Sequence, residues 1–190
     1  MDTKKISFVT SNSGKFQEVS DYFKELYPSI QIEQINMDIP EIQSLDVDEV
    51  ALNKAKYAWD LLKIPLIIDD GGIYLEQYNN FPGPLAKYVF QGIGFEGFWR
   101  LAENDPRVYF LCKIIYIDGP ESYKIVEGTL KGKTIKPLSM PKDLDLPFTE
   151  IFVPEGFDQV FSAVKKTPAG KIINHRYKAI RSLIEYLECS

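Results

Sequence analysis

The feature that most constrains the fold is a short apolar run that ends in two adjacent carboxylates and two glycines. The run is Leu66-Ile67-Ile68, and Asp69-Asp70-Gly71-Gly72 follows it directly. A half-exposed strand alternates apolar with polar side chains, so this unalternating run predicts a buried strand covered on both faces. Ligands of open α/β sheets bind beyond the carboxyl ends of such strands, because the loops leaving them open a crevice there. The acid pair is therefore a candidate metal and general-base site.

A simple turn is the alternative interpretation of the same segment. Asp and Gly are both favoured in turns, Asp because its side chain bonds to nearby backbone and Gly because it tolerates positive φ. Turn chemistry explains many clusters of this kind. The choice between the two interpretations depends on the rest of the chain, which favours the functional one.

The composition excludes several classes of protein. With 190 residues, 45% of them hydrophobic and 13% aromatic, the chain is globular rather than disordered. This length predicts a single domain spanning residues 1–190 with a sizeable core. Lys and Arg number 22 against 27 Asp and Glu, a net charge of -5, so there is no general basic surface for nucleic acid. An anionic ligand would have to be met by a local basic cluster.

Cysteine, histidine and hydropathy narrow the possibilities further. Cys112 and Cys189 do not make a disulfide framework or a zinc site, which predicts a reduced, cytoplasmic protein. The amino-terminal residues run directly into a strand pattern, and no apolar stretch is long enough to cross a bilayer, so we expect neither export nor a membrane partner. His175 is the only histidine, which excludes metal sites built from several histidines.

Hydrophobic periodicity predicts alternating strands and helices followed by a hairpin and a closing helix. This order indicates an α/β fold with a mixed sheet. The expected strands are 6–9, 31–35, 66–68, 108–117 and 122–130, and the main expected helices are 15–26, 47–63 and 174–187.

Two lysines stand where an anion could meet them. Lys15 opens the predicted helix 15–26, and the free N–H groups and dipole of a helix amino end attract anions. An ordinary helix cap is the alternative there, and the spacing of the P-loop is absent. Lys54 lies beside the apolar stripe of the helix 47–63, where a lysine is costly unless it reaches water or meets an anion.

Five separated motifs together resemble the inosine triphosphate pyrophosphatase family. They follow one another in the order expected from about residue 5 to 187, which makes the set specific although each motif alone is weak. The motifs are Thr10-Ser11-Asn12-Ser13-Gly14-Lys15-Phe16-Gln17-Glu18, Ile39-Pro40-Glu41-Ile42-Gln43, Asp69-Asp70-Gly71-Gly72-Ile73, Phe81-Pro82-Gly83-Pro84 with Lys87-Tyr88, and Asn174-His175-Arg176-Tyr177-Lys178-Ala179.

The resemblance implies a Mg²⁺-dependent hydrolase that converts ITP, dITP and XTP to the monophosphate and pyrophosphate. Members of the family are usually homodimers. Their fold is an elongated mixed β-sheet flanked by helices in two lobes, with the nucleotide in a central cleft. We therefore expect this α/β fold, a nucleoside triphosphate as substrate and Mg²⁺ as cofactor.

The family motifs also imply roles for individual residues. Glu41 and Asp70 correspond to the acids that hold Mg²⁺, a cation that prefers oxygen ligands, and Asp70 is also the candidate that activates the attacking water. His175 and Arg176 correspond to the pair that reads the purine, since a 6-oxo purine presents an acceptor where adenine presents a donor. The residues expected to contact the triphosphate are Thr10, Asn12, Lys15, Lys54 and Lys87.

Departures from the family pattern gather on the base side. The family run whose aromatic stacks on the base aligns with Leu146–Phe152, where Phe148 keeps an aromatic ring but the usual Gly, Asp and Pro are absent. We expect Phe148 and Thr149 to contact the substrate from this loop. Gly71 replaces the usual Ser or Thr after the acid pair, and Lys171 comes one position later than the family lysine. Both remain candidate substrate contacts.

Two alternatives stay open beside this interpretation. The altered loop is compatible with a pyrophosphatase of the same mechanism that prefers another base. A catalytically inactive nucleotide-binding protein is the second alternative. Retention of Glu41, Asp70, Lys15 and Lys54 argues against it, because binding alone would not need both acids.

Overall fold

The computed structural model describes residues 4–136 and 147–189. Its described part is built on one six-stranded mixed sheet with the strand order β2-β1-β3-β4-β5-β6. β1 is parallel to β2 and to β3, whereas β3, β4, β5 and β6 pair antiparallel. The strands are β1 (Lys4–Val9), β2 (Ile30–Ile35), β3 (Leu66–Leu75), β4 (Arg107–Ile117), β5 (Tyr123–Thr134) and β6 (Phe152–Pro154).

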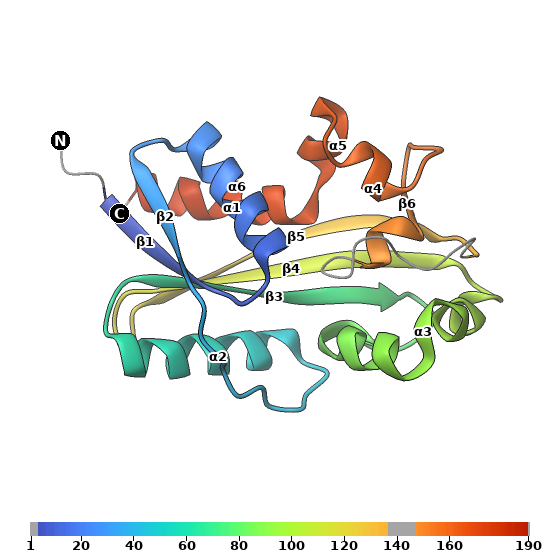
Figure 1. Cartoon of the computed structure of the whole chain (residues 1–190), viewed down its shortest axis with the longest axis horizontal. Helices are drawn as coiled ribbons and strands as arrows, with labels where there is room; N and C mark the ends of the chain where they lie inside the picture. Colours follow the sequence, from blue (N-terminus) through green and yellow to red (C-terminus); the bar gives the residue numbers. More distant parts are fainter. Residues whose placement is uncertain (1–3, 137–146, 190) are drawn as a thin grey trace.

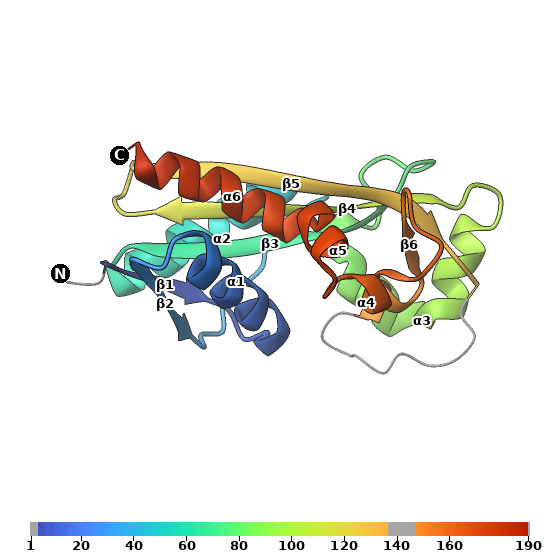
Figure 2. The same cartoon turned by 90° about the horizontal axis from the view of Figure 1, so that it is seen from above.

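Helices cover both faces of this elongated sheet. Figure 1 shows α1 and α6 on one face, with α4 and α5 farther along that face, and α2 and α3 on the other. Figure 2 shows α6 running along the sheet over β4 and β5. The helices are α1 (Ser13–Leu26), α2 (Val47–Leu62), α3 (Ala86–Ala102), α4 (Phe161–Val164), α5 (Pro168–Ile173) and α6 (His175–Glu188), with 3-10 turns η1 (Gly83–Leu85) and η2 (Pro147–Glu150).

Buried apolar side chains form clusters that divide the molecule into two lobes. One cluster joins the sheet to α1 and α6, and a second joins it to α2; together they make the first lobe. Another cluster, rich in phenylalanine, joins the far ends of β3, β4 and β5 to α3, α4 and η2. We call this second part the distal lobe. The predicted α/β fold, an elongated mixed sheet flanked by helices in two lobes, is confirmed.

Local signals placed most elements correctly. The three long predicted helices occur within two residues of their expected ends. α1 begins at Ser13 because the Asn12 side chain caps it, accepting a hydrogen bond from the Lys15 backbone N–H at 2.8 Å. The hairpin is β4–β5. Gly94, with φ +62°, breaks α3 into two helical pieces.

The predicted position of the acid pair is wrong in one respect. Asp69, Asp70 and the two glycines neither form a turn nor follow a strand end, because β3 continues through them to Leu75. β4 runs antiparallel beside the whole of β3, so the ladder of backbone hydrogen bonds favours continued extension. Gly71, at φ +154°, lets the strands approach closely: a Cβ there would lie 2.0 Å from the Leu111 carbonyl oxygen.

The other side of β3 explains why the acids are still accessible. β1 pairs with β3 only at Leu66 and Ile67 and then ends at Val9. The acids therefore lie just beyond the carboxyl end of β1, at the crevice expected for a ligand site of an α/β sheet.

Candidate functional site

The acid pair divides between the two faces of the sheet. Successive side chains of a strand point to opposite faces. Asp69 accordingly contacts α1 and α6 through Lys15 and Arg176, whereas Asp70 contacts α2 through Lys54. Two charged clusters thus lie back to back on one strand, at the place where β1 ends.

Asp69 lies at the centre of the first cluster. Its Oδ1 accepts a hydrogen bond from Lys15 Nζ at 2.7 Å, and its Oδ2 accepts one from Arg176 Nε at 2.5 Å. The side chain is only 2% exposed. Burial acts to raise the pKa of Asp69, but Arg176 and then Lys15 outweigh it and hold this pKa well below its usual value. Asp69 is therefore ionised at neutral pH.

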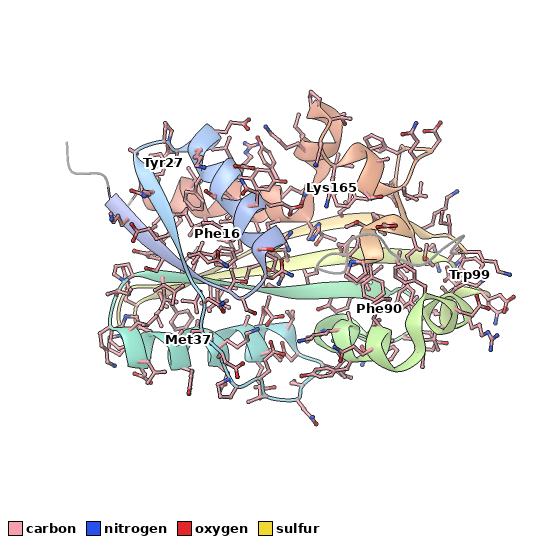
Figure 3. The ribbon with its side chains drawn as sticks, in the orientation of Figure 1. Phe16, Tyr27, Met37, Phe90, Trp99 and Lys165 are labelled. Carbon is pink, nitrogen blue, oxygen red and sulfur yellow. The ribbon has the colours of Figure 1, made fainter. Side chains whose placement is uncertain are left out.

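A second carboxylate meets Arg176 from α1. Glu18 Oε2 accepts a hydrogen bond from Arg176 Nη1, so the guanidinium lies between two acids. Lys165, at the end of α4, approaches the other oxygen of Glu18 at 3.9 Å. Figure 3 shows Lys165 on the α1 face of the sheet. The sequence interpretation missed both Glu18 as a site residue and Lys165. Glu18 lies in the first quoted motif, one turn after Lys15, whereas no pattern marked Lys165.

His175 is buried beside Arg176. Its ring stacks on Phe110 with centroids 5.0 Å apart and an interplanar angle of 11°. Burial, and next the charge of Arg176, lower the pKa of His175 well below its usual value, so the imidazole is neutral. Nδ1 is a buried atom without a hydrogen-bond partner in the described residues. Such an atom is costly unless a ligand satisfies it.

These side chains line a pocket between the lobes. Its empty volume, open mouth included, is about 610 Å³. Its lining includes the charged side chains of Lys15, Asp69 and Arg176 and the aromatic residues Phe148 and Phe161. The pocket therefore offers both cations and an apolar, aromatic surface.

The second cluster joins the two predicted metal acids. Lys54 Nζ donates to Glu41 Oε1 at 2.6 Å and to Asp70 Oδ2 at 2.9 Å. Burial would lower the pKa of Lys54, but the Asp70 charge and the hydrogen bond to Glu41 together raise it above its usual value. The backbone N–H of Gly71 donates to the other oxygen of Asp70 at 2.7 Å.

This arrangement fits a Mg²⁺ ion. Glu41 and Asp70 converge on one positive charge, the Lys54 ammonium, and both offer the carboxylate oxygens that Mg²⁺ prefers. Within residues 4–136 and 147–189 no group of three or more His, Cys, Asp or Glu side chains is arranged to hold a metal. Two protein acids still suit Mg²⁺, which keeps several waters and takes its remaining ligands from phosphates.

Thr10 and Asn12 lie at the amino end of α1, directly after β1. The Asn12 backbone N–H donates to Thr10 Oγ1 at 3.1 Å, and Asn12 itself caps the helix. The structure thus brings both residues to the helix end that carries Lys15, where an anion is favoured. Their contact with substrate remains a prediction.

Phe148 and Thr149 lie in η2 and line the pocket. Both are buried. The Phe148 ring also packs against Phe98 at 4.9 Å and Phe90 at 5.7 Å between centroids, within the distal lobe. Figure 3 marks Phe90 on α3, across the sheet from Lys165. Phe148 is therefore a core residue whose ring also faces the pocket. Leu146, the first residue of this predicted loop, lies outside the described residues.

Five of the expected substrate contacts do not line this pocket, namely Thr10, Asn12, Lys54, Lys87 and Lys171. Lys171 pairs with Glu25 and lies over the Tyr177 ring, away from the pocket lining. The preceding position, Gly170, has no room for a side chain, because a Cβ would lie 1.9 Å from the Val164 carbonyl oxygen. Lys87 is exposed in the first turn of α3 and is absent from the lining.

An aromatic pocket lined by cations, with the carboxylates of Glu41 and Asp70 on the opposite face of the sheet, defines an α/β protein suited to a phosphorylated ligand that has a flat, apolar part. No helix of the described residues is long and apolar enough to cross a membrane. The chain belongs to the Ham1 family, whose model matches residues 6–186.

Similar proteins agree with this assignment over nearly the whole chain. The chain is 33% identical over 187 residues to the dITP/XTP pyrophosphatase of Thermococcus kodakarensis, covering 97% of each. It is 31% identical to inosine triphosphate pyrophosphatase 1 of Trypanosoma cruzi, covering 94% of this chain and 90% of that one. The Ham1 protein of Staphylococcus aureus has a similar structure, with a TM-score of 0.76 at 25% identity over 97% of this chain and 98% of that one. The resemblance to the inosine triphosphate pyrophosphatase family is confirmed.

Proposed function

We propose that this protein hydrolyses non-canonical purine nucleoside triphosphates, namely ITP, dITP and XTP, to the monophosphate and pyrophosphate. Relatives named dITP/XTP pyrophosphatase and inosine triphosphate pyrophosphatase support this activity. The observation that carries the proposal is the division of the acid pair: Asp69 holds cations beside an aromatic pocket, and Asp70 joins Glu41 and Lys54 on the other face. A triphosphate lying around the end of β1 would reach both clusters.

The phosphate chain would be bound from α1 and α2. The amino end of α1, whose dipole attracts anions, would bind one end of it together with Thr10 and Asn12. Lys15 and Lys54 supply positive charge, and the raised pKa of Lys54 keeps its ammonium protonated. Charge neutralisation of this kind is the main source of catalysis in phosphoryl transfer.

Mg²⁺ is the proposed cofactor, held by Glu41, Asp70 and phosphate oxygens. When bound it would supply further positive charge to the phosphates. In this structure Lys54 donates hydrogen bonds to both acids. With the metal bound, Lys54 would donate a hydrogen bond to the phosphate chain as well.

The proposed reaction consumes one water. Asp70 accepts a proton from the water, whose oxygen forms a bond to phosphorus as the anhydride bond between the α- and β-phosphates breaks. Lysine charge stabilises the departing pyrophosphate, and the monophosphate stays attached to its nucleoside. Asp70 keeps its carboxylate aligned through the Gly71 N–H.

The base would lie against the aromatic lining of the pocket, beside His175 and Arg176. Arg176 presents N–H donors there, and Nδ1 of the neutral His175 has no hydrogen-bond partner within residues 4–136 and 147–189. A 6-oxo group is an acceptor that the Arg176 donors satisfy, whereas the 6-amino group of adenine leaves them unpaired. Phe148 offers a ring face for stacking.

Hydrolysis over a panel of nucleotides tests the proposal. ITP, dITP, XTP, ATP, GTP and CTP are each incubated with the full chain with and without Mg²⁺, and monophosphate and pyrophosphate are quantified by chromatography. We expect equal amounts of the two products, a preference for the 6-oxo purines over ATP, and no turnover after chelation. Release of orthophosphate instead of pyrophosphate would contradict the cleavage position.

The altered loop around Phe148 favours one second candidate, the same reaction on a different base. The panel decides between them by the ratio of kcat/KM values. We also propose that residues 1–190 act as one catalytic domain and that the protein is a homodimer, which light scattering of the purified chain measures.

A further inference from the structure

We propose that Asp69 is a positioning residue that sets the base-reading and phosphate-binding side chains of the site relative to each other. The role rests on the proposed function, because it concerns the same nucleotide site. Of the two adjacent acids, the family motifs assign a role only to Asp70. The hydrolysis proposed above uses no atom of Asp69.

Each carboxylate oxygen of Asp69 holds a different cation. Oδ1 holds Lys15 at 2.7 Å, and Oδ2 holds Arg176 at 2.5 Å. Lys15 comes from the first turn of α1 and Arg176 from the first turn of α6, which approach β3 from separate parts of the chain. With 2% of its side chain exposed, Asp69 joins the two helices at a point where water cannot substitute for it.

The contacts leave each cation with donors for a ligand. Lys15 Nζ uses one hydrogen on Asp69 Oδ1 and a second on the Asp69 backbone oxygen at 3.3 Å, so one of its three hydrogens remains. Arg176 uses Nε on Asp69 and Nη1 on Glu18, and among the described residues Nη2 has no partner. Because both side chains line the pocket, Asp69 fixes the direction of these remaining donors.

Stability alone is a weak reason for this buried network. The cost of removing charges from water offsets much of their attraction, and apolar replacements of buried ion pairs are often equally stable. A carboxylate with one cation on each oxygen does provide a defined distance between the two cations. Productive geometry of this kind is what binding and catalysis require.

Asp69→Asn tests the role, with Glu18→Gln as a partial counterpart. Asparagine keeps the shape of the Asp69 side chain but lacks its negative charge and one of its acceptor oxygens. Lys15 and Arg176 therefore both lose the carboxylate that holds them in place. Glu18→Gln disturbs Arg176 and leaves the Lys15–Asp69 contact in place. Asp60→Asn, in an exposed pair with Lys63 near the end of α2, is the matched control for loss of one carboxylate.

The measurements separate the two halves of the site. Steady-state kinetics give KM and kcat for ITP and ATP, and calorimetry gives Kd for pyrophosphate and for inosine monophosphate. For Asp69→Asn we expect about tenfold or greater losses of affinity for both pyrophosphate and inosine monophosphate, as expected for charged hydrogen bonds. The KM for ITP should rise more than kcat falls, and the preference for ITP over ATP should shrink. For Glu18→Gln we expect weaker binding of inosine monophosphate and an unchanged affinity for pyrophosphate. For Asp60→Asn we expect no change in either affinity or in the kinetic constants.

A lower Tm for Asp69→Asn with ligand constants within about twofold of the wild type would overturn the role, since Asp69 would then be structural only. If Asp69→Asn does not fold, Asp69→Glu retains the charge but moves it by one methylene, and the same paired losses are expected. Unchanged constants in Asp69→Glu, or its failure to fold as well, would equally overturn it. A wild-type chain that binds these ligands without turning ITP over would contradict the hydrolysis and not the positioning role.

Discussion

Replacing Phe148 by alanine tests whether one ring serves both the core of the distal lobe and the wall of the pocket. Phe148 is 7% exposed, and its ring contacts those of Phe98, Phe90 and Phe95, with centroids 4.9, 5.7 and 6.2 Å away. Truncation of a ring packed in this way costs about 3–5 kcal/mol of unfolding free energy. Total stability of a domain is only about 5–15 kcal/mol, so the loss is large.

The pocket side of the same ring predicts a second loss. If a purine stacks on Phe148, its removal should weaken nucleotide binding by about 1–3 kcal/mol. This corresponds to roughly a 5- to 150-fold increase in Kd. Phe148→Leu separates the effects, because leucine keeps apolar volume in the core but has no flat face for a base.

Urea unfolding without ligand gives the stability of each variant, and calorimetry with the imidodiphosphate analogue of ITP gives its affinity. Phe98→Ala is the control, since Phe98 is fully buried in the same cluster and does not line the pocket. It should lose stability and keep the affinity of the folded fraction. Phe148→Ala within about 1 kcal/mol of wild-type stability would refute the packing argument. Wild-type affinity in Phe148→Leu would refute stacking on this ring.

Four further outcomes are expected. Asp70→Asn should lower kcat by several orders of magnitude while far-UV circular dichroism stays that of the wild type, because a metal-site acid and proton acceptor is lost; near-normal turnover would remove Asp70 from both roles. Lys15→Ala should weaken all triphosphates alike, whereas Arg176→Ala should weaken 6-oxo purines most, and equal losses across bases would exclude Arg176 from base reading. The depressed pKa of His175 means that below its usual pKa of 6.5 the unfolded chain binds a proton that the folded chain does not. Stability should therefore fall as pH drops below about 6.5, by up to about 1.4 kcal/mol per pH unit, and His175→Gln should flatten the profile measured by urea unfolding between pH 5 and 7. Gly71→Ser, which inserts the usual family side chain, should lower Tm because its Cβ would lie 2.0 Å from a backbone oxygen of the neighbouring strand; an unchanged Tm would show that β4 shifts without cost.

Local patterns in the sequence were sufficient for the helices and for the kind of sheet. The apolar stripe of α2 and the caps of α1 and α6 are properties of a few neighbouring residues, and the structure places these helices within two residues of the prediction. The order of strand and helix segments indicated a mixed α/β sheet for the same reason. The motif set was also sufficient to indicate the family, because motif residues and their order are read directly from the chain.

The length of β3 depended on a neighbour that is distant in the sequence. Asp and Gly are turn formers locally, so the acid pair was predicted at a strand end or in a turn. In the folded chain β4 pairs with β3 through both acids and both glycines, and this pairing outweighs the local preference. The sequence alone therefore identified the acids but not the strand that divides them between two faces.

The assembly of the site was likewise decided by packing. Glu41 and Lys54 were both predicted as site residues, yet only the packing of α2 and of the loop before it against the sheet brings them to Asp70. Lys171, expected to contact the substrate, pairs with Glu25 instead. A lysine at the preceding position would not fit, because Val164 leaves no room for a side chain at Gly170. Residue types and their local spacing determined which chemical groups this protein has. Contacts between residues more than 100 positions apart, such as Asp69 with Arg176, decided which groups act together, because close packing of helices on the sheet sets those distances.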